Sequence, residues 1–205
     1  MTASHPRVVG FDLDMTLVDS RQAILASFAA VAAETGVPID PAGVDSRLGV
    51  TLEAELVHWF PPDEIGFAVA IYRKHYPLLA GERTSALPGA FEALAAVRGS
   101  GARVAVISAK FEPTVRDTLD ALGLEADEVF GGLHGPAKGD VLATLKAAAY
   151  VGDTPPDMRA AVQAGSFGVG TATGSFSASE LSSAGAGVVL GALTEFPAWY
   201  AGFVR

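Results

Sequence analysis

The segment VVGFDLDMTLVDS, residues 8–20, opens with an apolar run and then places two carboxylates, Asp12 and Asp14, directly after it. The run RVVGFDL at residues 7–13 is short and rich in β-branched residues, which is typical of a buried strand. Two carboxylates about 4 Å apart repel each other by roughly 4 kcal/mol at an effective dielectric constant of about 20. Such a pair at a strand end needs protons or a cation, which predicts a chemical role.

The rest of the chain alternates between strand and helix patterns. Strand patterns lie at residues 102–108, 128–132, 149–153, 167–171 and 187–191. Helical patterns lie at residues 87–101, 114–123, 139–148 and 156–165. This alternation predicts an α/β fold with a doubly wound parallel sheet. In such a sheet the carboxyl ends of the strands border one crevice, where ligands bind.

Residues 20–86 interrupt this alternation. They show helical patterns without a strand pattern, at about residues 20–34, 51–59 and 62–76. The segment is too long for one crossover helix, so we expect an inserted helical cap at residues 20–86. The Rossmann-like core would then consist of residues 1–19 and 87–205.

The composition restricts the partners of this chain. Half of its 205 residues are apolar, which suits one domain with a modest insertion. The net charge of −9 argues against binding to nucleic acids or to anionic membranes. No cysteine is present, so disulfides and thiolate metal sites are excluded. The opening residues MTASHPR carry no apolar targeting segment, and no apolar run approaches the about 18 residues of a membrane span, so we expect a cytoplasmic protein.

Further polar residues follow the predicted strands at the same edge of the sheet. Ser108 ends the strand at 102–108, and Lys110 comes two residues later. Asp153 ends the strand at 149–153, with Asp157 four residues on, and Lys138 stands at the start of the preceding helix. A group of carboxylates beside a phosphate suits Mg²⁺, which prefers oxygen ligands. The ion and a lysine would form a small positive site on an acidic protein.

Four motifs in this chain resemble those of the haloacid dehalogenase (HAD) superfamily, in its phosphatase branch with a helical cap after the first strand. DLDMT at 12–16 resembles the first motif, Asp-x-Asp-x-Thr, and VISAK at 106–110 resembles the second. PAKGD at 136–140 and GDTPPD at 152–157 resemble the third and fourth. Four motifs in this order are specific, whereas one alone would be weak. The nearest resemblance is to phosphoglycolate phosphatase-like proteins.

The resemblance implies a role for each matching residue. Asp12 is implied as the nucleophile and a Mg²⁺ ligand, and Asp14 as the general acid and base whose backbone carbonyl touches the metal. Asp153 is implied as a Mg²⁺ ligand, with Asp157 supporting the ion directly or through water. The remaining matches would brace the loop or hold phosphoryl oxygens: Thr16, Ser108, Ala109 and Lys138.

Some positions keep two interpretations. Lys110 competes with Lys138 as the phosphate-binding lysine, because Lys138 lies unusually close in sequence to Asp153. Arg47 and Thr51, in RLGVTLEAEL at 47–56, resemble a cap loop that reaches the leaving group. They can equally be a surface arginine and a helix N-cap. Met15 stands where the family most often has glycine, which bears on the geometry of the loop.

We predict an enzyme that hydrolyses phosphate monoesters of small metabolites with Mg²⁺, through an aspartyl phosphate. A carboxylate nucleophile divides this hydrolysis into two easier steps, and Asp14 supplies the separate proton donor. Carbon–halogen cleavage is disfavoured, because a halide needs no proton on leaving. The alternatives are a sugar phosphomutase, a nucleotide or pyrophosphate hydrolase, and, in another class, a phosphate-binding protein or a phospho-accepting receiver module. Receiver modules lack the long helical insertion.

Overall fold

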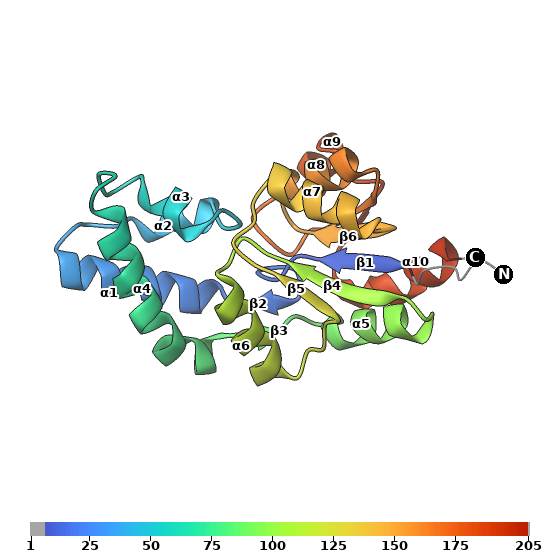
Figure 1. Cartoon of the computed structure of the whole chain (residues 1–205), viewed down its shortest axis with the longest axis horizontal. Coiled ribbons are helices and arrows are strands. Elements are labelled where there is room, and N and C mark those ends of the chain that lie inside the picture. Colours follow the sequence, from blue (N-terminus) through green and yellow to red (C-terminus); the bar gives the residue numbers. More distant parts are fainter. Residues whose placement is uncertain (1–6, 205) are drawn as a thin grey trace.

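The strand that precedes Asp12 lies inside a parallel sheet in the computed structural model, which describes residues 7–204. The sheet has six strands in the order β5-β4-β1-β6-β7-β8 (Figure 1). They are β1 (Val8–Phe11), β4 (Arg103–Ile107), β5 (Glu128–Phe130), β6 (Ala149–Gly152), β7 (Phe167–Thr171) and β8 (Val188–Leu190). Every pairing is parallel. The predicted α/β fold with a doubly wound parallel sheet is confirmed.

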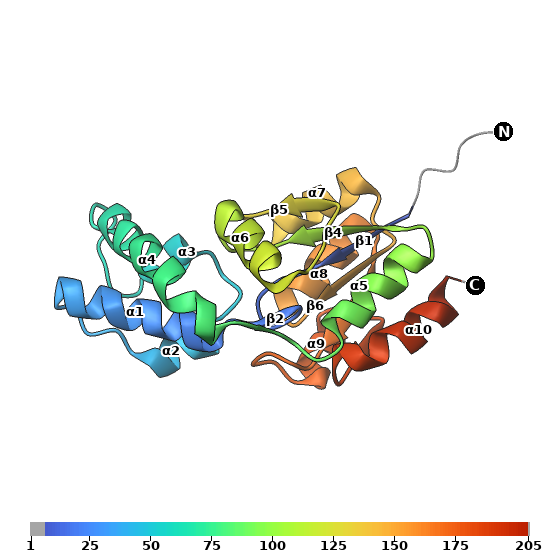
Figure 2. The same ribbon diagram turned by 90° about the horizontal axis from the view of Figure 1, so that it is seen from below.

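Helices cover both faces of this sheet (Figures 1 and 2). On one face, Val9 and Phe11 of β1 share an apolar cluster with α5 (Ala90–Gly99), α6 (Glu112–Leu122) and α10 (Phe196–Phe203). On the other face, Val8 shares a second cluster with α7 (Pro136–Leu145) and α8 (Pro155–Ala164). Successive side chains of a strand point to opposite faces, so β1 is buried on both, which accounts for its continuous apolar run.

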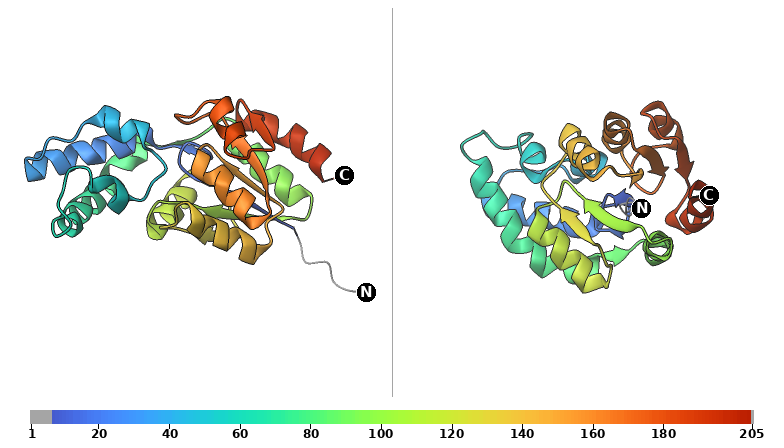
Figure 3. Two further views of the ribbon diagram at one scale, coloured as in Figure 1. Left: turned by 90° about the horizontal axis from the view of Figure 1, so that it is seen from above. Right: turned by 45° about the vertical axis from the view of Figure 1, so that its right-hand side comes forward.

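The helical insertion forms a separate lobe beyond the carboxyl ends of the strands (Figures 1 and 3). Its helices are α1 (Arg21–Thr35), α2 (Pro41–Ser46), α3 (Leu52–Leu56) and α4 (Ile65–Ala80). They pack around an apolar cluster of their own that includes Phe28, Leu56 and Ile71. The chain leaves the core through β2 (Val18–Asp19) and returns through β3 (Ser85–Ala86), which pair antiparallel. Both connections to the lobe therefore run side by side.

Several predicted helix boundaries are wrong. The pattern predicts a helix at 51–59, but α3 covers only Leu52–Leu56. It predicts a helix at 62–76, but α4 runs from Ile65 to Ala80 and continues through Pro77. Pro77 removes a single helix hydrogen bond, and the helix continues through it to Ala80. The helix predicted at 139–148 begins earlier, at Pro136, because proline suits the first helical position.

Short elements were not predicted, because they are too short to show a periodic pattern. They are α2, the β2–β3 pair, η1 (Gly81–Arg83), α9 (Ala178–Ser183), η2 (Leu193–Glu195) and α10. The start of α2 does carry a sequence signal, an aspartate followed by a proline. Asp40 is the N-cap residue and accepts hydrogen bonds from the backbone N–H groups of Ala42 and Gly43. The same holds for α9, where Ser177 and Glu180 form a capping box.

Two observations bear on the expected location of the protein. Residues 1–6, most of the segment that carries no apolar targeting signal, lie outside the described residues. Between residues 7 and 204, no helix is both long and apolar enough to cross a membrane.

Candidate active site

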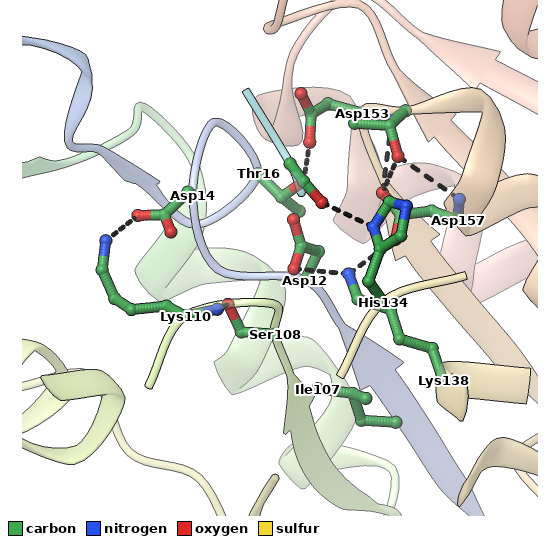
Figure 4. A network of polar contacts seen from close by, with 12 residues as sticks. Asp12, Asp14, Thr16, Ile107, Ser108, Lys110, His134, Lys138, Asp153 and Asp157 are labelled. Carbon is green, nitrogen blue, oxygen red and sulfur yellow. Dashed lines mark hydrogen bonds and ion pairs between the residues drawn. The ribbon is translucent and has the colours of Figure 1, made fainter. Parts of the chain in front are cut away.

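Three neighbouring strands bring Asp12, Ser108 and Asp153 to one edge of the sheet. Each residue directly follows its strand, β1, β4 and β6. The Asp12 N–H donates to the Val151 carbonyl (2.8 Å), and the Ser108 N–H donates to the Phe130 carbonyl (2.9 Å). The sheet pairing thus continues one residue beyond β1 and β4, which fixes the backbone of both residues. The two acidic segments recognised in the sequence meet here (Figure 4).

Three carboxylates gather at this edge. Asp12, Asp153 and Asp157 each offer an oxygen, and these atoms lie within 4.8 Å of one another. All three side chains are buried, and Asp157 belongs to the first turn of α8. The cluster lies where the sheet and the start of α8 exclude water, so its charge is poorly screened.

The oxygens of Asp157 are already occupied within the protein. Its Oδ1 accepts from Lys138 Nζ (2.7 Å) and from the Tyr150 hydroxyl (3.3 Å). Its Oδ2 accepts from the Thr154 hydroxyl (2.6 Å), as part of a capping box at the start of α8. Asp12 and Asp153 have one such contact each, from Lys138 (2.8 Å) and Thr16 (3.1 Å), within residues 7–204. Asp12 and Asp153 therefore have more free lone pairs for a metal than Asp157.

Lys138 neutralises part of this charge. It is the third residue of α7, it is buried, and it forms ion pairs with Asp12 and Asp157. Burial alone would lower the pKa of Lys138, but the two carboxylates more than offset this effect and hold the pKa well above its usual value. A charged lysine is therefore built into the edge of the sheet.

The negative charge of the cluster exceeds this single positive charge. Burial raises the pKa of Asp12 to about 7, although Lys138 opposes the shift. Burial also raises the pKa of Asp153 well above its usual value, and the charges of Asp12 and Asp157 add to the rise. A divalent cation would relieve this excess, and a buried set of carboxylate oxygens has the ligand chemistry that Mg²⁺ prefers. The residues present thus fit such an ion.

Asp14 lies outside the cluster (Figure 4). Its side chain turns away from Asp12 and forms an ion pair with Lys110 (2.6 Å), and it accepts a hydrogen bond from the Ser20 hydroxyl. Burial alone would lower the pKa of Lys110, but Asp14 and the tyrosines Tyr76 and Tyr72 raise it above its usual value. The two carboxylates of the first motif therefore have different environments and different lysines.

A tight loop separates these two carboxylates from the cap. Met15 has a left-handed backbone conformation (φ 60°), which residues other than glycine rarely adopt. Glycine would adopt this conformation without a steric penalty, so the loop favours glycine at this position. Thr16 is fully buried and its hydroxyl donates to Asp153 Oδ1. Thr16 thus braces the loop against a carboxylate of the cluster.

The loop after β4 supplies the opposite wall. Ser108 and Ala109 are buried, and both line a cavity of about 370 Å³ that also reaches Asp12 and Asp14. The hydroxyl of Ser108 accepts from the Lys110 N–H (3.2 Å). The structure thus separates the two candidate lysines: Lys138 lies beside Asp12, and Lys110 lies beside Asp14.

The cap closes the other side of this cavity. Arg47 lines it, and the Arg47 guanidinium pairs with Glu55 through Nη2 (2.7 Å to Oε1) and Nε (3.0 Å to Oε2). Thr51 does not line it; its hydroxyl accepts from the Ala54 N–H and caps α3. The two candidate residues of the helical lobe therefore differ. Arg47 faces the cavity, and Thr51 is the N-cap residue of α3.

Contacts between cap and core hold the lobe over the crevice. His134 Nδ1 donates to the Gly49 carbonyl (2.9 Å), and the Ser175 hydroxyl donates to the Asp45 carbonyl (3.2 Å). Two cations also lie over aromatic rings across the gap. Lys110 Nζ is 4.7 Å from the Tyr76 ring centre, and Arg73 is 4.1 Å from that of Phe111. The structure thus shows the cap in contact with the core.

Sequence reasoning missed two residues that follow β7. A Cβ atom at Gly174 would lie 1.9 Å from Asp153 Oδ2, so only glycine allows this approach. The Thr173 hydroxyl donates to the Met15 carbonyl and anchors the loop of the first motif. Both residues come after a parallel strand, at the same edge as Asp12. The strand-end rule could have found them, but neither type carries a chemical signature.

Comparison with known proteins agrees with this geometry. Residues 9–162 match the family of haloacid dehalogenase-like hydrolases. The phosphoglycolate phosphatase of Aquifex aeolicus is 31% identical over 176 residues, which cover 78% of this chain and 81% of the phosphatase. The tyrosine-protein kinase PtkA of Mycobacterium tuberculosis is 31% identical over 121 residues, which cover 58% of this chain. The match covers only 42% of that kinase, so the chain spans less than half of its length.

A solved structure has the same fold. A haloacid dehalogenase-like family hydrolase from Streptococcus pneumoniae superimposes with a TM-score of 0.80 at 23% identity. The superposition covers 98% of this chain and 99% of that one. The likeness therefore includes the helical lobe as well as the sheet.

Proposed function

Because the chain belongs to the haloacid dehalogenase-like hydrolases, we propose that it hydrolyses phosphate monoesters of small molecules through a phosphorylated Asp12. One observation carries this proposal. Asp12 lies inside a buried cluster with Lys138, while Asp14, two residues later, lies outside it beside Lys110. Two identical side chains can serve as nucleophile and as acid only if their environments differ.

The first step transfers the phosphoryl group to Asp12. A carboxylate oxygen of Asp12 forms a bond to phosphorus as the bond to the ester oxygen breaks, and the ester oxygen takes a proton from Asp14. Lys138 and the Ser108 hydroxyl would face the phosphoryl oxygens, since both lie beside Asp12. Phosphoryl transfer depends mainly on positioning and on charge neutralisation, which these groups supply.

The second step returns the enzyme to its starting state. A water molecule gives a proton to Asp14 and attacks phosphorus, and the bond between phosphorus and the Asp12 oxygen breaks. Inorganic phosphate leaves, and Asp14 again carries the proton it lost in the first step. No oxidant or further reactant is needed.

Mg²⁺ is the metal that we propose for this site. Asp12, Asp153 and the backbone carbonyl of Asp14 would hold it, with Asp157 acting mainly through its bonds to Lys138 and Thr154. A bound ion would offset the charge of the carboxylates and of the phosphoryl group.

We also propose that residues 20–86 act as a mobile cap. Its two connections run side by side through β2 and β3, so bending at one place would move the whole lobe. In the closed state the cap would exclude water from Asp14 and surround the leaving group. The core would then consist of residues 1–19 and 87–205.

Phosphate release tests the proposal. The protein should liberate inorganic phosphate from members of a panel of small phosphate monoesters in the presence of Mg²⁺, and excess chelator should abolish this activity. The acceptor that we propose is water, since the similarity to a phosphatase covers more of both chains than the similarity to a kinase does. A protein that transfers phosphate to an alcohol, without releasing it, would refute this choice.

A further inference from the structure

The cap gives the cavity a largely apolar wall. Its side chains come from α1, α2, α3, α4 and the loop before α3: Ile24, Phe28, Val44, Leu48, Leu52 and Tyr72. Tyr72 stacks against Tyr76 (ring centres 5.7 Å apart) and meets Phe28 edge-on (5.1 Å). A wall of this kind favours an apolar body in the ligand, because apolar surface is removed from water on both sides.

The charged side chains of this wall are already paired. Arg47 is bound to Glu55 through two nitrogens, and the carboxylate of Glu55 is almost fully buried. Arg73 pairs with Glu53 (2.9 Å) while it covers the ring of Phe111. Two arginines and two glutamates therefore leave the cap side of the cavity with no net charge.

This pairing works against an anionic leaving group. A carboxylate on the leaving group would have to compete with Glu55 for Arg47, whose Nε and Nη2 are both bonded to that glutamate. Glu55 is buried and offsets the charge of Arg47, so the pair attracts a second carboxylate only weakly.

Tyr76 offers one polar contact instead. Its side chain is buried and lines the cavity, and its hydroxyl has no hydrogen-bond partner within residues 7–204. A buried hydroxyl without a partner costs free energy, so a small shift of the Tyr76 side chain that brings its hydroxyl to a neutral oxygen on a ligand would be favourable.

We propose, on the basis of the phosphatase function above, that the substrates are monoesters of uncharged, largely apolar alcohols or phenols. The transferred phosphate is then the only charged group of the substrate. The leaving group packs against the aromatic wall and meets Tyr76 with a neutral oxygen. A phosphoglycolate-like ester, with its second anionic group, is a poor substrate.

Binding tests this selection without turnover. Benzylphosphonate and its para-carboxylated analogue have the same body and cannot be hydrolysed as esters. Calorimetry in Mg²⁺ should give the uncharged phosphonate a Kd lower by about 30-fold, a ratio typical of a mismatched polar group. Equal affinities, tighter binding of the carboxylate, or no binding of either compound would overturn the inference.

Turnover of the matching esters separates this inference from the proposed function. Selective binding of the uncharged phosphonate, with no phosphate release from benzyl phosphate or from any other ester, would remove the phosphatase proposal and leave the ligand class. Phosphate release with a preference for carboxylated esters would refute the proposed ligand class and support the phosphatase proposal.

One variant pair probes the cause of the selection. Glu55→Gln keeps the size of the side chain and releases Arg47 from its charge. It should raise kcat/KM for the carboxylated ester relative to benzyl phosphate by about 10-fold. Glu34→Gln is the matched control, since Glu34 pairs with Lys74 and His75 on the cap and does not line the cavity. An equal change in both variants, or none in Glu55→Gln, would contradict the role of the Arg47–Glu55 pair.

Discussion

Asp12 and Asp14 stand two residues apart on one loop, and each is paired with a different lysine. Lys138 Nζ lies 2.8 Å from Asp12, and Lys110 Nζ lies 2.6 Å from Asp14. Lys138 comes from α7 on one face of the sheet, whereas Lys110 comes from the loop after β4. The sheet thus gives two adjacent carboxylates separate surroundings, which is what a division between nucleophile and acid requires.

Replacing Lys138 should destabilise the fold far more than replacing Lys146, which lies at the other end of α7. Lys138→Met leaves Asp12 and Asp157 without their buried cation, so the free energy of unfolding should fall by about 3 kcal/mol and activity should be lost. Lys146→Met, at the exposed end of α7, is the control and should change stability by less than about 0.5 kcal/mol. Urea unfolding and phosphate release measure both effects. Equal stability of the two variants would show that Lys138 does not neutralise the cluster.

Metal binding should depend on pH through Asp12 and Asp153. Both have a folded-state pKa above the unfolded value, so in metal-free protein they stabilise the fold most below about pH 4. That contribution is lost as the pH rises, in the case of Asp12 through about 7. Mg²⁺ needs the ionised carboxylates, so it should raise the Tm more at pH 8 than at pH 5. Thermal unfolding with and without Mg²⁺ measures this difference. Asp153→Asn should reduce it, and a shift that is the same at both pH values would argue against a carboxylate site.

Gly174 should matter because of the space beside Asp153. In Gly174→Ala the new methyl group would meet Asp153 Oδ2, so the carboxylate must move and Mg²⁺ affinity should fall by about 10-fold or more. Gly202→Ala is the control, since a Cβ at Gly202 meets nothing within 4 Å. Calorimetric titration with Mg²⁺ compares the two. Unchanged affinity in Gly174→Ala would mean that Asp153 is not a ligand.

The loop of the first motif should carry backbone strain at Met15. Met15→Gly and Met15→Ala both remove the buried side chain, but only alanine keeps the cost of the left-handed backbone. Met15→Gly should therefore be the more stable variant by about 1 kcal/mol. Urea unfolding gives the difference. If Met15→Ala is as stable as Met15→Gly or more so, the loop is not strained.

The sequence predicted the parts of the site that depend on one local rule. Asp12, Ser108 and Asp153 directly follow parallel strands, and such strand ends share one edge of the sheet. Their positions could be inferred because the apolar runs before them are short and distinct. The helical insertion was equally clear, since residues 20–86 show helical patterns without a strand pattern, and the two-residue strand β3 at their end is too short to show one.

The parts that depend on side-chain packing between distant elements could not be predicted. The pairing of Arg47 with Glu55 depends on the turn between α2 and α3, and the unpartnered hydroxyl of Tyr76 depends on how α4 faces the core. The close approach of Gly174 to Asp153 joins the loops after the neighbouring strands β6 and β7, and no local pattern shows that a glycine is required there. No local pattern encodes such contacts, because tertiary packing alone decides them.

Loss of the acid should separate the two chemical steps. In Asp14→Asn, an activated aryl phosphate such as 4-nitrophenyl phosphate can still transfer its phosphoryl group, because 4-nitrophenolate leaves without a proton. Water attack on the phosphorylated Asp12 would lack its base, so turnover should stall by a factor of about 10²–10⁴. Alkyl phosphates should be nearly inert. Rapid mixing should show a burst near one equivalent of 4-nitrophenolate, and equal slowing of both ester types without a burst would contradict the role of Asp14.

The same variant shows directly whether Asp12 is phosphorylated. Asp14→Asn is mixed with 4-nitrophenyl phosphate and Mg²⁺, quenched in acid after the burst, digested, and analysed by mass spectrometry. We expect about one phosphoryl group per chain, on the peptide that contains residues 8–20, and fragmentation should place it on Asp12. A phosphoryl group on another residue, or 4-nitrophenolate released with no phosphorylated peptide, would contradict this expectation.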